Sequence, residues 1–312
     1  MLTADTLTKR HGPRTAVDGL SFTVEPGRVT GFLGPNGAGK TTTMRMFLDL
    51  VRPTSGRALV NGRRYTDLAW PAREVGALLD AGSAHPGRTG RAHLRSKAHV
   101  CGLPRTRIEE VLDEVGLSEA ADRRIAGYSL GMRQRLGVAD ALLADPGVLL
   151  FDEPANGLDL DGVRWMRELI RRLAGQGRTV LVSSHLMGEV EQVADRLLVV
   201  GRGRLVADAS VEELIGAWSH AHVLVRSPRT EPLRLRLAQA ARADTGIRVE
   251  EACEGALRVS GLSAERIGDL AHETGVPVHG LWSHRASLEQ AYLELTDGSV
   301  EYGAGVPEEV GS

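Results

Sequence analysis

A glycine-rich stretch at residues 34–42, GPNGAGKTT, carries the strongest chemical signal in the chain. Glycine, four residues, glycine, lysine and threonine is the pattern of a loop that binds phosphate groups through its backbone N–H groups. Gly34, Gly37 and Gly39 allow the backbone to curl, because side chains there would block the approach of the phosphates. The stretch predicts a binding site for a nucleoside triphosphate.

The polar side chains of this stretch supply the charges that such a site needs. Lys40 places a cation beside the β and γ phosphates, the Thr41 hydroxyl is suited to bind Mg²⁺, and Thr42 is a further donor to phosphate. The predicted nucleotide-binding residues in this stretch are Gly34, Pro35, Asn36, Gly37, Ala38, Gly39, Lys40, Thr41 and Thr42.

Two acids follow an apolar run at 148–151, VLLF. Adjacent carboxylates repel each other, so a buried pair needs a cation. Asp152 is predicted to hold Mg²⁺, directly or through water, and Glu153 to deprotonate the water that attacks the terminal phosphate. His185 follows a second such run, TVLVSS at 179–184, and is predicted to bind the γ phosphate and to hold the water and Glu153 in place.

The elements that position these residues follow from the hydrophobic pattern. The stretches at 147–153 and 179–184 are continuous apolar runs that end in polar residues, as in strands that are covered on both faces. Between them apolar residues recur at helical spacing, so the unit is strand, crossover helix, strand. A strand at 29–33 precedes the glycine-rich stretch, and a helix at 41–51 follows it. The pattern predicts an α/β domain with a mostly parallel sheet, in which ligands bind at the carboxyl ends of the strands.

Two further regions differ from this pattern. Residues from about 86 to 145 have helical periodicity and predict an inserted helical subdomain. After residue 220 the order of elements is βαββαβ, with the last strand near Val276 to His279, which predicts a small ferredoxin-like α+β domain. The predicted organisation is a large domain at 1–220, a small domain at 221–297 and a flexible tail at 298–312.

Composition limits the function classes. The 312 residues carry a formal net charge of −2, with 42% hydrophobic and 25% charged residues, as in an ordinary globular protein. A near-neutral balance gives no strongly basic field, which argues against a protein that serves to bind nucleic acid through its phosphates. The apolar runs are much shorter than a membrane span, and the N-terminal residues do not resemble a secretory signal, so we expect a cytosolic location. Cys101 and Cys253 have no metal-ligand spacing, and we expect reduced thiols.

Taken together with YSLGMRQRL at 128–136 and ANGLD at 155–159, these motifs resemble the ATP-binding subunits of ABC transporters. The resemblance is to the bacterial group that works with separate permeases to export drugs, antibiotics or lipid-like compounds, and it covers about residues 3–220. It implies a P-loop NTPase fold, ATP and Mg²⁺ as ligands, ATP hydrolysis coupled to transport, and a place on the cytoplasmic face of the membrane.

The resemblance also implies partners. Two copies of the subunit close head to tail on two ATP molecules and drive a separate transmembrane permease, and no nucleic acid is involved. By position, Ser129 and Gly131 then contact the γ phosphate of the ATP bound to the opposite subunit, and Asp159 crosses the dimer axis. A helix N-terminus at 130–132 would offer the second anion site that this arrangement needs.

The sequence departs from the family pattern in three places. His11 stands where the family has an aromatic residue that stacks on adenine. The signature stretch reads YSLGM, whereas the commoner form has two glycines and a glutamine. Asp80 stands where the family has a glutamine that touches Mg²⁺ and the permease, and a carboxylate there adds negative charge beside the γ phosphate.

Other interpretations remain open at this point. A soluble ABC-type ATPase that acts on ribosomes or DNA would be expected to have tandem ATPase halves, a coiled coil or zinc-binding cysteines, which the sequence does not show. A kinase would need a site for a substrate hydroxyl group, and the signature stretch and His185 argue against it. For the small domain we favour a packing or dimerisation module over a regulatory ligand site.

Overall fold

The computed structural model describes residues 1–218, 222–243, 246–252, 255–284, 288–289 and 292. The chain divides into two compact units between Val211 and Glu212. The predicted boundary at residue 220 stays a prediction, because residues 219–221 lie outside the described part. The predicted tail at 298–312 and the thiol of Cys253 also lie outside it.

A six-stranded sheet forms the centre of the first unit, in the order β5-β6-β7-β3-β8-β9. All neighbouring strands in it run parallel except β8 and β9, which are antiparallel. The carboxyl ends of β3, β5, β6 and β7 therefore meet at one edge of the sheet. The strands are β3 (Val29–Leu33), β5 (Val75–Leu78), β6 (Val148–Asp152), β7 (Thr179–Ser184), β8 (Arg196–Gly201) and β9 (Arg204–Ser210).

A separate antiparallel sheet of three strands, in the order β2-β1-β4, completes the first unit's sheets. Its strands are β1 (Leu2–His11), β2 (Arg14–Val24) and β4 (Ser55–Val60). Leu2 pairs with Val24 on one side and with Val60 on the other, and all three side chains are buried. The alternating apolar residues of β2 face the core, as expected for a sheet with one covered face.

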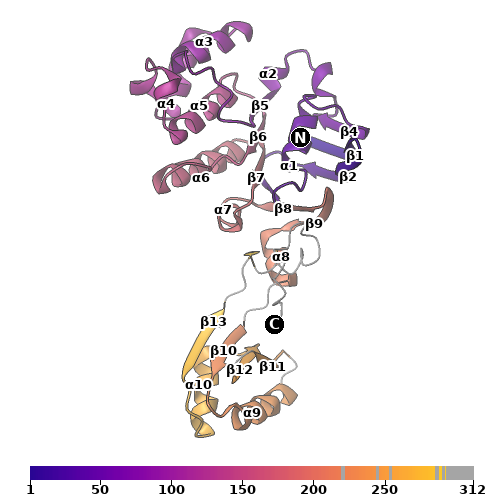
Figure 1. The fold of residues 1–312 in the computed structure, drawn as a ribbon, viewed down its shortest axis with the longest axis vertical. Coiled ribbons are helices and arrows are strands. Elements are labelled where there is room, and N and C mark those ends of the chain that lie inside the picture. Colours follow the sequence, from indigo (N-terminus) through magenta and orange to yellow (C-terminus); the bar gives the residue numbers. More distant parts are fainter. Residues whose placement is uncertain (219–221, 244–245, 253–254, 285–287, 290–291, 293–312) are drawn as a thin grey trace, which may run out of the picture. The chain divides into compact units, whose positions relative to one another are not determined.

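The helices of the first unit include three that connect β5 to β6 and form a separate group in Figure 1. These are α3 (Gly90–Val100), α4 (Arg105–Glu114) and α5 (Leu130–Leu142), and they lie in the region predicted to be helical. Helix α6 (Leu160–Gly175) crosses between β6 and β7, as the apolar spacing predicts. The other helices of the first unit are α1 (Lys40–Phe47), α2 (Pro71–Glu74) and α7 (Met187–Glu191). Helix α8 (Val211–Trp218) begins at the division, and all but its first residue belongs to the second unit.

The inner strands β3, β6 and β7 of the central sheet are buried on both faces, and the strands of the sheet contribute to two hydrophobic clusters. On β6, Leu149 and Phe151 belong to the cluster that includes the α3–α6 helices, and Val148 and Leu150 belong to the cluster that includes the three-stranded sheet and α1. This alternation explains why the sequence of β6 is continuously apolar. The site residues at the end of β6 are therefore held by packing from both sides.

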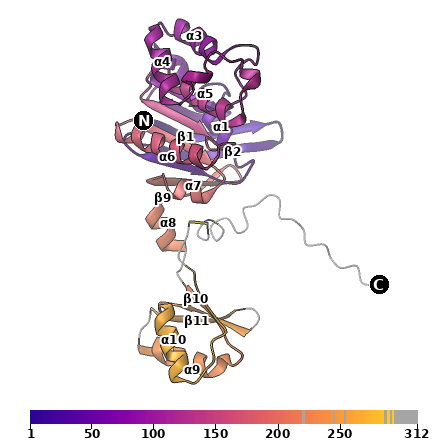
Figure 2. The same ribbon diagram turned by 90° about the vertical axis from the view of Figure 1, so that its left-hand side faces the viewer.

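After α8, the second unit has the order βαββαβ and an antiparallel sheet β11-β12-β10-β13, which is the ferredoxin-like arrangement that the sequence predicts. Figure 2 shows α9 and α10 lying along this sheet, and their apolar faces form a third buried cluster with it. The elements are β10 (His222–Arg226), α9 (Thr230–Ala243), β11 (Arg248–Ala252), β12 (Ala256–Ser260), α10 (Ala264–Glu273) and β13 (Gly280–His284).

The predicted position of the last strand was wrong. Val276 is buried, and its N–H donates to Ala271 O at 2.9 Å, so this residue ends helix α10 and packs into the core instead of starting a strand. Gly275 precedes it with φ +64°, and the strand begins at Gly280. Val276, whose apolar character suggested a strand, therefore lies at the C-terminal end of a helix.

Candidate nucleotide-binding and catalytic site

The glycine-rich loop runs from the end of β3 to the start of α1, as the sequence predicts. Gly39 has φ +103°, and a Cβ placed on it would lie 2.6 Å from Ala16 O. Gly34 has the same constraint, because its Cβ would lie 2.5 Å from Val200 O. Close backbone neighbours therefore exclude a side chain at both ends of the loop, and at Gly39 the left-handed conformation favours glycine as well.

The loop lines an open cleft with a volume of about 450 Å³. Most of the predicted nucleotide-binding residues contribute to it, together with Glu153 from the end of β6 and His11 and Arg14 from the ends of β1 and β2. The lining residues are His11, Arg14, Ala16, Asn36, Gly37, Ala38, Gly39, Lys40, Thr41, Thr42 and Glu153.

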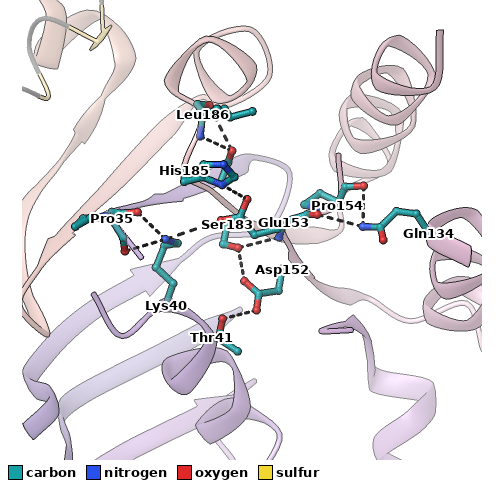
Figure 3. A network of polar contacts seen from close by, with 12 residues as sticks. Pro35, Lys40, Thr41, Gln134, Asp152, Glu153, Pro154, Ser183, His185 and Leu186 are labelled. Carbon is teal, nitrogen blue, oxygen red and sulfur yellow. Dashed lines mark hydrogen bonds and ion pairs between the residues drawn. The ribbon is translucent and has the colours of Figure 1, made fainter. Parts of the chain in front are cut away.

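Lys40 is buried in the loop, with its side chain 6% exposed. Its ammonium group donates to Gly34 O at 2.6 Å and to Pro35 O at 3.3 Å, and lies 3.9 Å from Glu153 Oε1 (Figure 3). Burial lowers the pKa of the Lys40 ammonium, and the charges of Glu153 and Asp152 oppose this shift. The cation is held inside the loop, between the backbone carbonyls and the acid at the end of β6.

Asp152 is buried at the end of β6 and is held by two hydroxyl groups. Thr41 Oγ1 donates to Asp152 Oδ2 at 2.6 Å, and Ser183 Oγ donates to Asp152 Oδ1. Thr41 comes from the first turn of α1, and Ser183 from β7, the strand beside β6. The three elements together fix the direction of this carboxylate.

Glu153 lies beside His185 at the carboxyl ends of β6 and β7. His185 Nδ1 lies 2.7 Å from Glu153 Oε2. The backbone of Glu153 is also held, because its N–H donates to Ser183 Oγ at 3.0 Å. One carboxylate oxygen therefore faces the histidine, and the other lies toward Lys40.

A third acid lies near this pair. Burial raises the pKa of the Glu189 carboxyl, and the charge of Glu153 raises it further, whereas Arg167 and His185 act in the opposite direction. Glu189 belongs to α7, the short helix that follows His185. The short helix after His185 thus carries an acid, Glu189, whose ionised form is disfavoured.

The donor set fits a hard divalent cation. A threonine hydroxyl and a carboxylate converge at Thr41 and Asp152, and Mg²⁺ prefers such oxygen ligands together with substrate phosphates and water. Among the described residues, no group of three or more His, Cys, Asp or Glu could hold a metal by itself. The residues present therefore suit Mg²⁺ that arrives with a nucleotide.

The predicted dimer residues lie outside the cleft at two helix N-termini. Ser129 caps α5 by accepting from Met132 N at 3.2 Å, and Asp159 caps α6 by accepting from Gly162 N at 2.8 Å. The two helix starts are adjacent, because a Cβ on Gly131 would lie 3.3 Å from Gly157 O. Ser129, Gly131 and Asp159 thus share one surface.

The comparisons with known proteins agree with this geometry. Residues 17–156 match the family described as ABC transporter. The daunorubicin resistance ATP-binding protein DrrA3 of Streptomyces coeruleorubidus is 33% identical over 95% of each chain. The bacitracin transport ATP-binding protein BcrA of Bacillus licheniformis is 39% identical over 67% of this chain and 69% of its own.

This chain belongs to the ABC transporter ATP-binding proteins. It is an ATPase of the ABC type, with the P-loop NTPase fold that its motifs imply. A solved ATP-binding subunit of an ABC transporter is 26% identical, covers 69% of this chain and 91% of its own, and has a TM-score of 0.63. Residues 221–289 match a family described as a domain of unknown function (DUF8746).

Two predicted residues at the departures from the ABC pattern have different surroundings. His11 lines the cleft, at the end of β1, where it pairs with Arg14 across the hairpin. Asp80 follows the edge strand β5 and accepts a hydrogen bond from Gly82 N at 2.7 Å. Asp80 is absent from the described residues that line the cleft, so its role at Mg²⁺ stays a prediction.

The structure adds three residues that the sequence analysis did not single out. Ser183 holds both acids, Arg14 lines the cleft, and Gln134 reaches from α5 to the backbone at the end of β6. Ser183 lies within the run TVLVSS, and its place two residues before His185 was the available signal. Nothing in the spacing of Arg14 or Gln134 distinguishes them from surface residues.

Proposed function

We propose that this ATPase drives the export of a drug, antibiotic or lipid-like compound through a separate membrane permease. The proposal is supported by relatives that match two thirds or more of this chain. Their names include bacitracin transport, daunorubicin resistance and Nod factor export. The observation that carries the catalytic part is the convergence of Lys40, Thr41, Asp152, Glu153 and His185 at one sheet edge.

In the proposed reaction, Glu153 accepts a proton from the water that attacks the γ phosphate. The Glu153–His185 contact keeps the carboxylate directed, because an Nδ1–H on His185 would donate to Oε2. His185 Nε2 is then free for the γ phosphate, and it is a donor there when the ring is protonated. Lys40 exchanges its carbonyl contacts for the β and γ phosphates and balances their charge.

Thr41 and Asp152 would hold Mg²⁺ against the phosphates, and the cation would supply electrostatic stabilisation of the charge that develops there. To reach that arrangement, the Thr41 hydroxyl must give up its hydrogen bond to Asp152. We propose that His11, which lines the cleft, contacts the base or ribose. Asp80 would be a further catalytic residue beside Mg²⁺ and the γ phosphate.

We also propose a head-to-tail homodimer in which Ser129 and Gly131 bind the ATP held by the opposite subunit. Support comes from the surface that these residues share with Asp159. Leu130 and Leu160, beside them, are 57% and 87% exposed, which is unusual for two large apolar side chains on adjacent helix starts. Helix N-termini attract anions, so ATP would join the two subunits.

The substitution Glu153→Gln tests the reaction and the dimer together. It removes the base but keeps the shape, so we expect turnover to fall at least about 100-fold while Mg-ATP stays bound. The trapped ATP should hold the variant as a dimer in light scattering, whereas the wild type with ADP should remain monomeric. Retained turnover would contradict the role of Glu153 as base, and an ATP-saturated monomer would contradict the dimer.

The permease and the location at the cytoplasmic face of the membrane are tested by co-purification. In the described part of the chain, none of the helices has the length and apolar character to cross a bilayer. We expect the full chain to co-purify from membranes with a protein of six predicted membrane helices, and transported compounds to stimulate ATP hydrolysis by that complex.

Absence of every such complex, with sedimentation on ribosomes or DNA instead, would contradict export and favour the soluble ABC-type ATPase. The second unit is proposed to serve packing or dimerisation in either case.

A further inference from the structure

Gln134 connects the helix of the signature stretch to the backbone of the catalytic acid. Its side chain lies in the first half of α5 and is 4% exposed. Its Nε2 donates to Glu153 O at 3.1 Å and to Pro154 O at 2.9 Å (Figure 3). Both hydrogens of the amide nitrogen are used, and the two carbonyl acceptors fix which side of the amide faces the strand end.

The backbone that Gln134 holds has an unfavourable conformation. Glu153 has φ +50°, in the left-handed region that few residues other than glycine adopt. Such a conformation persists only where the surroundings enforce it. Here Ser183 holds the Glu153 N–H at 3.0 Å on one side, and Gln134 holds the carbonyl on the other.

This conformation sets the direction of the Glu153 side chain. The turn at Glu153 directs the carboxylate out of the strand and toward His185 and Lys40, instead of onward along the strand. If the carbonyl were released, the backbone could relax toward an ordinary conformation, and the carboxylate would turn away from the water that it must deprotonate.

We propose that Gln134 is a positioning residue for ATP hydrolysis, which keeps the main chain of Glu153 in its left-handed conformation and so aims the catalytic carboxylate. This inference rests on the proposed role of Glu153 as base. Helix α5 would then act at two sites. Ser129 at its N-terminus is proposed to contact the partner's ATP, and Gln134, five residues later, holds the backbone of Glu153 in its own subunit.

A purely packing role for Gln134 makes a different prediction. An apolar side chain of similar volume would fill the same space, and it would avoid the cost of burying an amide. The substitution Gln134→Met therefore preserves packing and removes both donors. If Gln134 only filled space, this variant would hydrolyse ATP like the wild type.

We expect Gln134→Met to lower kcat about 10- to 100-fold, because small misplacements of a catalytic group have effects of this size. The Kd for Mg-ATP should change less than about twofold, since Gln134 is not among the described residues that line the cleft. Gln176→Met, at an exposed position at the end of α6, is the matched control and should keep wild-type turnover.

The decisive measurement is a cycle with Glu153→Gln. Without the base there is nothing to aim, so Gln134→Met should not lower the residual turnover of Glu153→Gln further. Multiplied losses in the double variant, or wild-type kcat in Gln134→Met, would overturn the inference. Circular dichroism melting identifies the folded temperature range, and Gln134→Glu, which can only accept when ionised, provides a second variant if Gln134→Met is unstable.

These outcomes are separable from failure of the proposed function. If Glu153→Gln itself kept full turnover, the base assignment would fail first. If Glu153→Gln is inactive and Gln134→Met is fully active, Glu153 remains the base and only the positioning role is lost.

Discussion

Single side chains in this site serve more than one neighbour. Ser183 Oγ donates to Asp152 and accepts from the N–H of Glu153 at 3.0 Å. The same hydroxyl therefore orients the acid proposed for Mg²⁺ and the acid proposed as base. Because the two acids share this hydroxyl, a shift of Ser183 would change the orientation of both carboxylates.

Glu189 gives a prediction on pH. Its raised pKa means that the ionised form is less favourable in the folded chain than in the unfolded one, where the ordinary value is 4.5. Below pH 4.5 the carboxyl is neutral in both states and does not affect the free energy of unfolding. Between pH 4.5 and the raised pKa the unfolded chain loses its proton first, so stability falls as pH rises through the raised pKa. Glu189→Gln should therefore stabilise the fold, and more so at pH 8 than at pH 5.

Urea unfolding at both pH values measures this difference. Glu191→Gln, which removes a carboxylate from the same short helix, is the matched control. A gain from Glu189→Gln that is equal at both pH values would show that the ionisation of Glu189 does not limit stability.

At the scale of elements, the loop between β3 and α1 depends on the space around Gly39. Gly39→Ala combines a left-handed conformation, which costs about 1–2 kcal/mol for a residue with Cβ, with a collision against Ala16 O at 2.6 Å. We expect the loop to shift and the Kd for Mg-ATP to rise at least about tenfold in isothermal calorimetry.

Gly27→Ala separates the two causes. Gly27 also has positive φ, at +77°, but a Cβ there would meet nothing within 4 Å. This variant should lose stability only, with nucleotide affinity unchanged. Equal affinity losses in Gly27→Ala and Gly39→Ala, or no loss in Gly39→Ala, would contradict the importance of the contact with Ala16.

The elements closest to the chemistry were predictable from the sequence. The strands at 29–33 and 179–184 were placed at their observed ends, because continuous apolar runs followed by glycine or polar residues indicate buried parallel strands. The last strand was misplaced, because the apolar Val276 packs into the core just after the end of helix α10 and is not part of a strand. Ser183 and Gln134 were not predicted, because their roles depend on which strands and helices become neighbours.

At the scale of the whole molecule, the chain has separate cores in its two units. The sheet and helices of the second unit bury their own cluster, and Leu257 on β12 is 1% exposed within it. Its replacement by alanine removes packed methyl groups at a cost of about 2–5 kcal/mol. We expect Leu257→Ala to lower the unfolding temperature of the second unit without changing the affinity for Mg-ATP.

Calorimetry with and without Mg-ATP tests this independence. Nucleotide should raise only the transition of the first unit, since it binds there. Leu149→Ala on β6, where Leu149 is fully buried, is the matched control and should lower that nucleotide-sensitive transition instead. A single transition that both substitutions shift equally would contradict separate cores.

Neighbouring side chains of β6 are buried on opposite faces of the sheet, and this has a consequence for how the protein tolerates substitutions. Successive side chains of this strand pack into different hydrophobic clusters. The same strand ends at Asp152 and Glu153, so packing on either face affects the position of these two acids. A repacked interior that preserves thermal stability can therefore still impair turnover, whichever side of the sheet is altered. Libraries of interior variants should be screened for hydrolysis as well as for melting temperature.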